Sequence, residues 1–239
     1  MRLVWDISDS DVAKWRNFVD ANINNEFVRE RQKRNIDRAT VDLSKGYLWH
    51  VHVGCQVTSV QRSGPNSPVF KFLNSNSPAL DYQECLESPD VKSMLISELS
   101  KSGLRRNKII AENLTSTLKV LESGLWEGFV EVLQSAFENG TQELERNAAN
   151  FLSENFRGIG LKQSRNYIQW IGISQYEIPL DSRVTKVMKR LGASFVPNAA
   201  AMSDAEVYYM VQGGLQLLAD KLGIKPCILD ACIFSSFDE

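Results

Sequence analysis

The sequence predicts an all-α protein, and three observations support this class. Apolar residues recur at three- and four-residue spacing along almost the whole chain, which is the period of an amphipathic helix. The one alternating stretch, residues 51–57, sits inside a longer helical pattern and lacks the turns that a hairpin needs. With 239 residues, 43% of them hydrophobic, the chain is long enough for one large domain or for two small ones that share a cleft.

Helix start and stop signals divide the N-terminal half. Ser8 or Asp9 is a suitable N-cap for the first helix, and the charge-rich residues 29–38 fit either a loop or an exposed helix. A long apolar helix is expected at residues 43–60. It ends in the polar segment 61–68, where a glycine and two prolines stop helix propagation, and residues 74–78 form a second polar break.

The C-terminal half is predicted to be a series of helices joined by short turns. Ser203 and Glu206 have the spacing of a capping box for the penultimate helix. Further helices are expected at residues 91–99, 105–121, 125–137, 143–155, 162–171, 183–191, 204–222 and 226–235. We predict two helical lobes, with residues 1–40 and 156–239 in one and residues 41–155 in the other.

Composition excludes several classes of protein. No window approaches ~18 consecutive apolar residues, and the N-terminus lacks the apolar core of a secretory signal. We therefore expect a soluble, cytoplasmic monomer without membrane contact, associated with the nucleoid if the source is prokaryotic. The four cysteines lie too far apart for a zinc knuckle, so we interpret them as reduced thiols, most of them in the core: Cys55, Cys85, Cys227 and Cys232.

The net charge of −2 conceals a basic block. Between residues 156 and 192 only Glu177 and Asp181 oppose seven basic side chains, and the rest of the chain is correspondingly acidic. The seven are Arg157, Lys162, Arg165, Arg183, Lys186, Lys189 and Arg190. Such asymmetry is expected where one face of a protein meets phosphate, although a solvated helix surface gives the same pattern.

The segment Phe156-Arg157-Gly158-Ile159-Gly160-Leu161-Lys162 lies between two predicted helices. Its two glycines permit a tight turn with positive φ, Ile159 can pack back between the helices, and the amides around Gly160 then point outward at a helix N-terminus. Such a turn suits a DNA phosphate, yet it also joins helices in proteins that bind no nucleic acid. A dinucleotide-binding loop is excluded, because no strand precedes the turn and Gln163 replaces the third glycine.

Taken with a second motif, this turn resembles the helix-hairpin-helix DNA glycosylase superfamily, and most closely its 8-oxoguanine glycosylase/lyase branch. Gly158-Ile159-Gly160-Leu161-Lys162 is followed nineteen positions later by Asp181, in Ile178-Pro179-Leu180-Asp181-Ser182-Arg183-Val184. The resemblance implies that Lys162 is the nucleophile and that Asp181 sits opposite it. It also implies a two-lobed fold with the hairpin at a DNA-binding cleft, where Arg157, Gly158, Gly160, Arg165 and Arg183 contact DNA.

Weaker matches extend the resemblance to roughly residues 43–234. Residues 103–110 resemble the start of a family helix, residues 57–63 the segment that inserts into the duplex, and residues 229–234 the element that closes the base pocket. The chain departs from the family in two ways. Only Cys227 and Cys232 lie where related branches hold an iron-sulfur cluster, so we expect no cluster. Phe156-Arg157 also replaces the common Leu-Pro.

The proposed chemistry can be argued from the residues themselves. A lysine amine with a pKa near 10.4 is protonated at neutral pH, so Lys162 must be partly desolvated or lie near cations such as Arg157 and Arg165. The carboxylate of Asp181 can accept a proton and stabilise positive charge on the sugar, with one oxygen free to cap the following helix. Attack on the anomeric carbon leaves a Schiff base and allows β-elimination. We expect neither a metal nor an organic cofactor.

Base excision from a duplex also needs a wedge and a stacking pocket. We predict that Gln61 is the wedge inserted into the duplex, with Arg62 as the next candidate. In the pocket, we predict that Phe234 stacks on the base and that Asp230 accepts hydrogen bonds from it, and Trp49 is a further pocket candidate. Phe234 fits a core position equally well. His50 and His52 lie on different helix faces without further ligands, so no catalytic role is expected for them.

Three functions remain open at this point. The first is a bifunctional glycosylase/lyase acting on an oxidised purine, 8-oxoguanine, in damaged double-stranded DNA during base excision repair. The second keeps the fold and Asp181 but acts on an oxidised pyrimidine or an alkylated base. The third is a non-catalytic helix-hairpin-helix module that positions DNA for a partner, in which Lys162 is dispensable.

Overall fold

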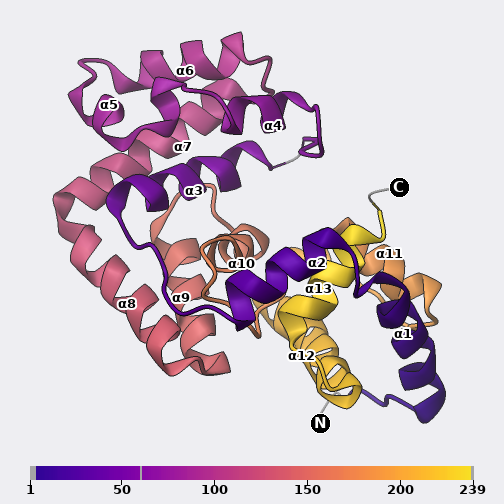
Figure 1. Ribbon diagram of the computed structural model, residues 1–239. Helices are drawn as coiled ribbons and strands as arrows, with labels where there is room; N and C mark the ends of the chain where they lie inside the picture. Colours follow the sequence, from indigo (N-terminus) through magenta and orange to yellow (C-terminus); the bar gives the residue numbers. More distant parts are fainter. Residues whose placement is uncertain (1–3, 60, 238–239) are drawn as a thin grey trace.

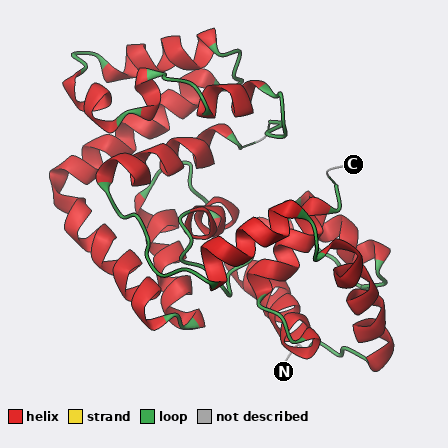
Figure 2. Ribbon diagram, viewed as in Figure 1, coloured by secondary structure: helices red, strands yellow, loops and turns green. Residues whose placement is uncertain are grey.

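The computed structural model describes residues 4–59 and 61–237, and all regular secondary structure in them is helical (Figure 2), which confirms the all-α class. The elements are α1 (Asp9–Asn22), α2 (Glu26–Arg31), the π-helical η1 (Gln32–Ile36), α3 (Lys45–Val57), α4 (Pro68–Leu73), the 3-10 turn η2 (Pro78–Leu80), α5 (Tyr82–Glu87), α6 (Val91–Lys101), α7 (Asn107–Val120), the π-helical η3 (Leu121–Leu125), α8 (Trp126–Asn139), α9 (Gln142–Asn155), α10 (Leu161–Trp170), α11 (Ser182–Arg190), the 3-10 turn η4 (Ala201–Ser203), α12 (Ala205–Leu222) and α13 (Pro226–Ser235).

Polar caps set where the helices begin. Ser8 caps α1 in a reciprocal capping box with Asp11, in agreement with one of the two predicted caps. The capping box predicted from Ser203 and Glu206 is wrong. Asp204 is the N-cap of α12, because its carboxylate accepts the amides of Glu206 and Val207, and a charged acceptor at this position interacts favourably with the helix dipole.

Helical periodicity in the sequence does not reveal the short helices, and it left the structure of the charged segment 29–38 open. α4 and α5 are six residues each, too short to display a helical period, and Pro68 is the first residue of α4 rather than a helix breaker. Residues 29–36 are helical in α2 and η1, in agreement with one of the two predicted alternatives; most of their charged side chains are exposed, while Arg31 and Asn35 are buried against other elements. The apolar helix predicted at residues 43–60 is α3, and Val60 itself lies outside the described residues.

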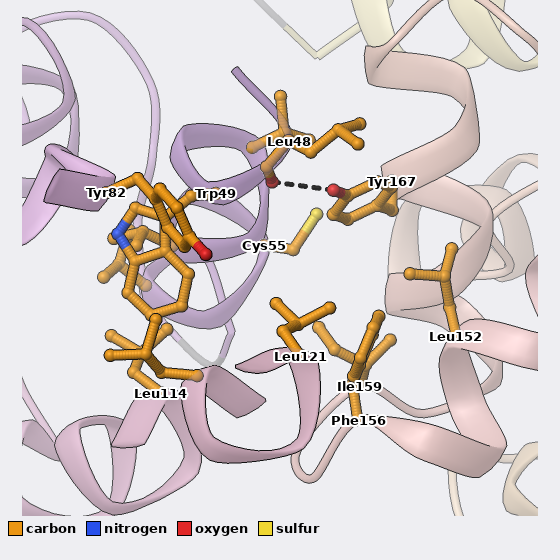
Figure 3. Close-up of a cluster of buried hydrophobic side chains, with 14 of the residues drawn as sticks. Leu48, Trp49, Cys55, Tyr82, Leu114, Leu121, Leu152, Phe156, Ile159 and Tyr167 are labelled. Carbon is orange, nitrogen blue, oxygen red and sulfur yellow. Dashed lines mark hydrogen bonds between the residues drawn. The ribbon is translucent and has the colours of Figure 1, made fainter. Parts of the chain in front are cut away.

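The helices form two groups, with α3 to α9 in one, α1, α2 and α11 to α13 in the other, and α10 between them (Figure 1). The first group surrounds an apolar core in which Phe156 and Ile159 of the hairpin and Tyr167 of α10 are buried (Figure 3). The Tyr167 hydroxyl donates to the Leu48 carbonyl of α3 across 2.7 Å. α10 is therefore fastened to α3 as well as to its neighbour α9.

A second apolar core joins α1, α2 and α11 to α13. This division differs from the predicted lobe boundary at residue 156, because the hairpin and most of α10 contribute their apolar side chains to the first core. Among the apolar side chains of α10, Leu161 packs against the second core, and the others pack in the first. In the sequence, the border between the two cores lies in the segment after α10. The start of α10 also reaches the second core, through Leu161.

Two further expectations concern burial and hydrophobicity. All four cysteines are free and buried, in agreement with their interpretation as core thiols. His52 lies among Trp49, Phe156 and Tyr167, and burial lowers its pKa to about 3, which makes it a neutral core residue. None of the helices in the described part of the chain has the length and apolar character needed to span a bilayer.

Candidate active site

The hairpin between α9 and α10 is held rigidly by α3 and α7. Gly158 has φ +81°, and a Cβ built there would lie 2.2 Å from Asn113 Nδ2 and 2.7 Å from Gln56 Oε1, so only glycine fits. Gln56 donates to the Arg157 carbonyl across 2.7 Å, and Asn113 donates to Gln56. Ile159, 2% exposed, packs between the helices as predicted. The turn therefore has one fixed conformation.

The second glycine of the hairpin has a different role. Gly160 has φ −93°, which any residue adopts, and space around its Cβ position is open, so the expected positive φ occurs at Gly158 only. Gly160 is the N-cap of α10 and no side chain caps this helix. The first amides of α10 are therefore left to solvent or to an anion. Arg157, exposed beside them, pairs with Glu112 of α7 across 2.8 Å.

Lys162 is the second residue of α10 and is half-buried. Burial lowers the pKa of its amine below the usual 10.5, and the positive charge of Arg183 lowers it further, while Asp181 opposes the shift. Asp230 and the thiol of Cys55 also lie within electrostatic range of the amine. The predicted desolvation of Lys162 is thus present, but Arg183 is the cation beside it, and neither Arg157 nor Arg165 contributes.

Asp181 is the N-cap of α11, and the structure brings its carboxylate into electrostatic range of the Lys162 amine. Oδ1 accepts the amides of Arg183 and Val184 at 2.8 and 3.3 Å. Oδ2, which was expected to face the sugar, accepts instead from Arg183 Nε at 2.8 Å and lies 2.6 Å from its Nη2. Both oxygens are therefore engaged, and Asp181 and Arg183 act as one ion pair beside Lys162.

Arg183 also covers the aromatic ring that was predicted to stack on a base. Its guanidinium carbon lies 3.8 Å from the centroid of the Phe234 ring, and Phe27 of α2 stacks on Phe234 with a centroid distance of 4.6 Å. A base can stack on Phe234 only after Arg183 or Phe27 has moved. Because the Arg183 side chain is partly exposed and Phe27 packs against the second core, Arg183 is the more mobile cover.

Asp230 of α13 lies beside this cluster but is already paired. Its carboxylate is 3.2 Å from Arg31 Nη1, and both side chains are buried. Burial raises the pKa of Asp230 while Arg31 opposes that rise. Arg31 and Phe27 both come from α2, far from the hairpin in sequence, and no local pattern marks them as neighbours of Lys162.

Two predicted site residues are wrong because they are fully buried. Arg165 is 0% exposed and pairs with Glu177 across 2.9 Å, so it cannot reach a phosphate. Trp49 is 0% exposed within the first core and donates to the Ala79 carbonyl, so it cannot line a base pocket. Both side chains support the fold rather than the site.

The predicted wedge residues lie on the loop after α3. Gln61 is not a free side chain, because its amide donates to the Val57 carbonyl at 2.7 Å and accepts the Arg105 amide at 2.9 Å. It therefore ties the end of α3 to the start of the α7 region. Arg62 is exposed. Of the two residues, Arg62 is the more exposed.

Comparisons with known proteins identify the fold. No protein-family model and no curated protein matches the sequence. Among solved structures, the 8-oxoguanine DNA glycosylase of Methanocaldococcus jannaschii superposes with a TM-score of 0.67 over 93% of this chain and 91% of its own, at 15% identity.

Two further structures agree with that result. The 8-oxoguanine DNA glycosylase of Thermotoga maritima gives a TM-score of 0.62 at 17% identity, covering 95% of this chain and 94% of its own. The M. jannaschii glycosylase/lyase bound to a 15mer DNA containing 8-oxoguanine gives 0.68 at 15% identity, covering 95% and 96%. The chain therefore has the helical fold of 8-oxoguanine DNA glycosylases, as the resemblance in the sequence predicted.

Proposed function

We propose that this protein is a DNA glycosylase with an associated lyase activity that excises an oxidised purine, 8-oxoguanine, from double-stranded DNA. The observation that carries the proposal is the half-buried Lys162, whose pKa is lowered next to the Asp181–Arg183 pair at the start of the helix after the hairpin. A partly desolvated amine is a nucleophile at a pH where an exposed lysine is not. The likeness to glycosylase structures supports the same function.

The reaction proceeds by displacement at the sugar. Lys162 Nζ forms a bond to C1′ as the glycosidic bond breaks, and the base leaves with the bonding electrons and gains a proton from the amine. The nitrogen keeps its second proton, O4′ takes a proton from water as the ring opens, and a protonated Schiff base remains. This iminium group acidifies C2′, so that solvent accepts the C2′ proton as β-elimination expels the 3′-phosphate. These steps balance without a metal or organic cofactor.

Asp181 acts mainly through its charge. Since both of its oxygens already accept hydrogen bonds, it is better suited to stabilising positive charge on the sugar than to receiving the amine proton directly. Arg183 holds the carboxylate in place in the free protein. When DNA binds, we expect Arg183 to leave Phe234 for a phosphate, which uncovers the ring for the base and opens Oδ2 of Asp181 toward the sugar.

The exposed part of the hairpin supplies the grip on the backbone. The amides at Gly158 and Gly160 and the guanidinium of Arg157 face outward at the uncapped start of α10, which suits a phosphate. Arg62, with Gln61 behind it, fills the space left by the extruded base, and Asp230 with Phe234 lines the base pocket. A few phosphate contacts of this kind make binding fall steeply with salt concentration.

Borohydride trapping tests the proposal, because only a Schiff-base enzyme becomes covalently linked to DNA. We expect the wild type to trap on an 8-oxoguanine duplex, Lys162→Gln to give no trapped complex, and Asp181→Asn to bind DNA but trap slowly. Undiminished trapping by Lys162→Gln would place the nucleophile elsewhere. Binding without any trapping by the wild type would favour a non-catalytic module.

The same assay separates the substrate classes. Matched duplexes with 8-oxoguanine, thymine glycol or a methylated purine differ only in the damaged base. Faster excision of 8-oxoguanine supports an oxidised-purine enzyme, whereas preference for either other duplex would assign an oxidised pyrimidine or an alkylated base as the substrate. The base opposite the damaged one is varied in parallel, because the residues proposed for the pocket contact the damaged base and not its partner.

A further inference from the structure

The segment between Lys162 and Asp181 is a buried loop. Residues 171–181 leave α10 and reach α11 without regular secondary structure, and most of them are inaccessible to solvent. Irregular segments normally run over the surface, where water satisfies their amides and carbonyls. In a buried loop, protein groups must take the place of that water. The partners of this loop therefore decide where α11, and with it Asp181, is held.

One carboxylate binds three consecutive amides of the loop, those of residues 175–177. Glu145 Oε1 accepts the Gln175 amide at 2.8 Å, and Oε2 accepts the Tyr176 amide at 2.8 Å and the Ser174 hydroxyl at 2.9 Å. The Glu177 amide is 3.4 Å from the same Oε2. Burial raises the pKa of the Glu145 carboxyl to about 7, and the charge of Glu177 adds to that rise, while the hydrogen bonds from Gln175, Tyr176 and Ser174 favour the ionised form.

Glu145 belongs to a rigid part of the first helical group. It lies in the first turn of α9, which packs along both α8 and α10 (Figure 1). The carboxylate is thus fixed relative to α10, which carries Lys162, while it grips the loop that carries Asp181. A side chain that belongs to neither α10 nor α11 sets the geometry between them.

A buried ion pair fastens the loop a second time. Glu177 is 0% exposed, and its Oε2 accepts from Arg165 Nε of α10 at 2.9 Å while Oε1 accepts from Arg146 of α9 at 3.3 Å. Arg165 also donates to Asn150 and lies against the ring of Tyr209. These contacts connect α9, α10 and α12 to one residue of the loop.

Side chains from α12 and from the segment before α3 bind further polar atoms of the loop. Arg38 donates to the carbonyls of Gly172 and Ile173, and Gln216 donates to the Tyr176 carbonyl at 2.9 Å. The Tyr208 hydroxyl donates to the Ile178 carbonyl and accepts the Leu180 amide, each at 2.9 Å. Pro179, between them, has no amide to satisfy. The loop is therefore fixed from both sides up to the residue before Asp181.

We infer that Glu145 is a positioning residue for the reaction, in that its grip on residues 174–177 sets the separation between the Lys162 amine and the Asp181 carboxylate. The inference rests on the proposed function, because a defined separation matters only if the two groups act together on one sugar. Glu145 does not reach the reacting atoms. It affects the placement of the Asp181–Arg183 pair. A displacement of 1 Å from a productive geometry lowers the reaction rate about a hundredfold.

The experiment compares Glu145→Gln with Glu143→Gln, a matched change at an exposed glutamate in the same turn of α9. The amide retains the shape of the side chain but points an N–H donor at loop donors. Single-turnover borohydride trapping at saturating 8-oxoguanine duplex gives the rate, and binding to a duplex with an uncleavable abasic analogue gives Kd. We expect Glu145→Gln to lower the rate about tenfold to a hundredfold with Kd unchanged, and Glu143→Gln to change neither.

Several outcomes would overturn the inference. A folded Glu145→Gln that traps at the wild-type rate does so, even if its melting temperature has fallen, because the role would then be structural only. If Glu145→Gln does not fold, Ser174→Ala removes one of the carboxylate's contacts and is assayed in the same way. A lower rate in Ser174→Ala supports the positioning role, and an unchanged rate contradicts it.

The failure of this inference differs from the failure of the proposed function. If the wild type itself does not trap, the proposed function is wrong and the positioning role is lost with it. If the wild type traps and neither variant is slower, only the positioning role is wrong. Hydrogen exchange at the Gln175 and Tyr176 amides, expected to be faster in Glu145→Gln, checks the anchoring of the loop without reference to any activity.

Discussion

Two clusters of charged side chains share α10 and differ in how completely they are paired. Around Arg165, each charge has a partner, and Glu177, which is fully buried like Arg165, accepts from Arg165 and from the partly exposed Arg146. One helical turn away, the Lys162 amine is half-buried, and burial and nearby charges lower its pKa without a hydrogen bond among the causes. The paired charges of Arg165, Arg146 and Glu177 join α9, α10 and the loop after α10. The Lys162 amine is the group that the proposed reaction uses.

The energetic cost of the two arrangements also differs. The desolvation cost of a buried, fully paired cation is offset by its partners, and the pair is expensive to disrupt, since removal of one partner leaves the other buried and alone. The charged form of a half-buried amine is partly desolvated in the folded state, which is the main cause of the lowered pKa of Lys162. Substitutions in the two clusters test this difference through their effects on stability and on trapping.

The largest expected effects come from one substitution made at both positions. Arg165→Met leaves Glu177 with Arg146 alone at 3.3 Å, so we expect a loss of about 3 kcal/mol in the free energy of unfolding. Lys162→Met removes an unfavourably buried charge, so we expect no loss of stability but no trapped complex. Urea unfolding and borohydride trapping measure the two effects. A Lys162→Met as unstable as Arg165→Met would mean that the two clusters have the same role.

The two hairpin glycines give the next largest contrast. Gly158→Ala forces a side chain into a left-handed conformation at a cost of about 1–2 kcal/mol, and its Cβ meets Asn113 as well. Gly160→Ala has open space and an ordinary φ, so only the modest loss of a glycine N-cap is expected. Thermal unfolding compares them. Equal destabilisation by the two substitutions would contradict the assignment of the tight turn to Gly158.

These cases also show which features of the protein can be predicted from sequence. The long helices follow from periodicity and the plugging isoleucine from the glycines of the hairpin, whereas the proximity of Lys162 and Asp181 is implied by the family resemblance that two short motifs carry. The role of Arg165 does not, because an arginine three residues after Lys162 looks the same whether it meets phosphate or Glu177. Only the fold brings Glu177 of the loop and Arg146 of α9 to it.

Long-range partners explain the other errors. Trp49 was placed near the pocket because it precedes the predicted wedge in sequence, but its helix turns that ring toward Ala79 in the core. Phe27 stacks on Phe234 from a helix some two hundred residues away, and no local pattern encodes such a pair. The charge block at residues 156–192 likewise contributes side chains to two different cores, which its sequence pattern does not show.

The pH dependence of trapping tests the lowered pKa of Lys162 directly. Because the pKa of Lys162 is lowered in the folded protein, the free amine and hence the trapping rate should rise with pH to a midpoint below 10.5. The folded state binds fewer protons than the unfolded state between the two pKa values, so the stability of the wild type relative to Lys162→Met should also rise over that range. A pH series of rates and unfolding curves measures both, and a rate midpoint at or above 10.5 would contradict the lowered pKa.

The smallest expected effect on stability lies at the surface. Arg157 pairs with Glu112 in an exposed ion pair, with 60% and 47% of the two side chains accessible, and such pairs contribute about 0–1 kcal/mol. Arg157→Gln should therefore leave the unfolding curve almost unchanged. If Arg157 contacts a phosphate, the slope of log K against log salt should fall by about 0.9, since one fewer counterion is released. Glu112→Gln is the matched control, because it breaks the same ion pair without removing the cation. An equal slope in wild type and Arg157→Gln would show that this guanidinium serves α7 rather than DNA, and would place it with Arg165 among the structural arginines.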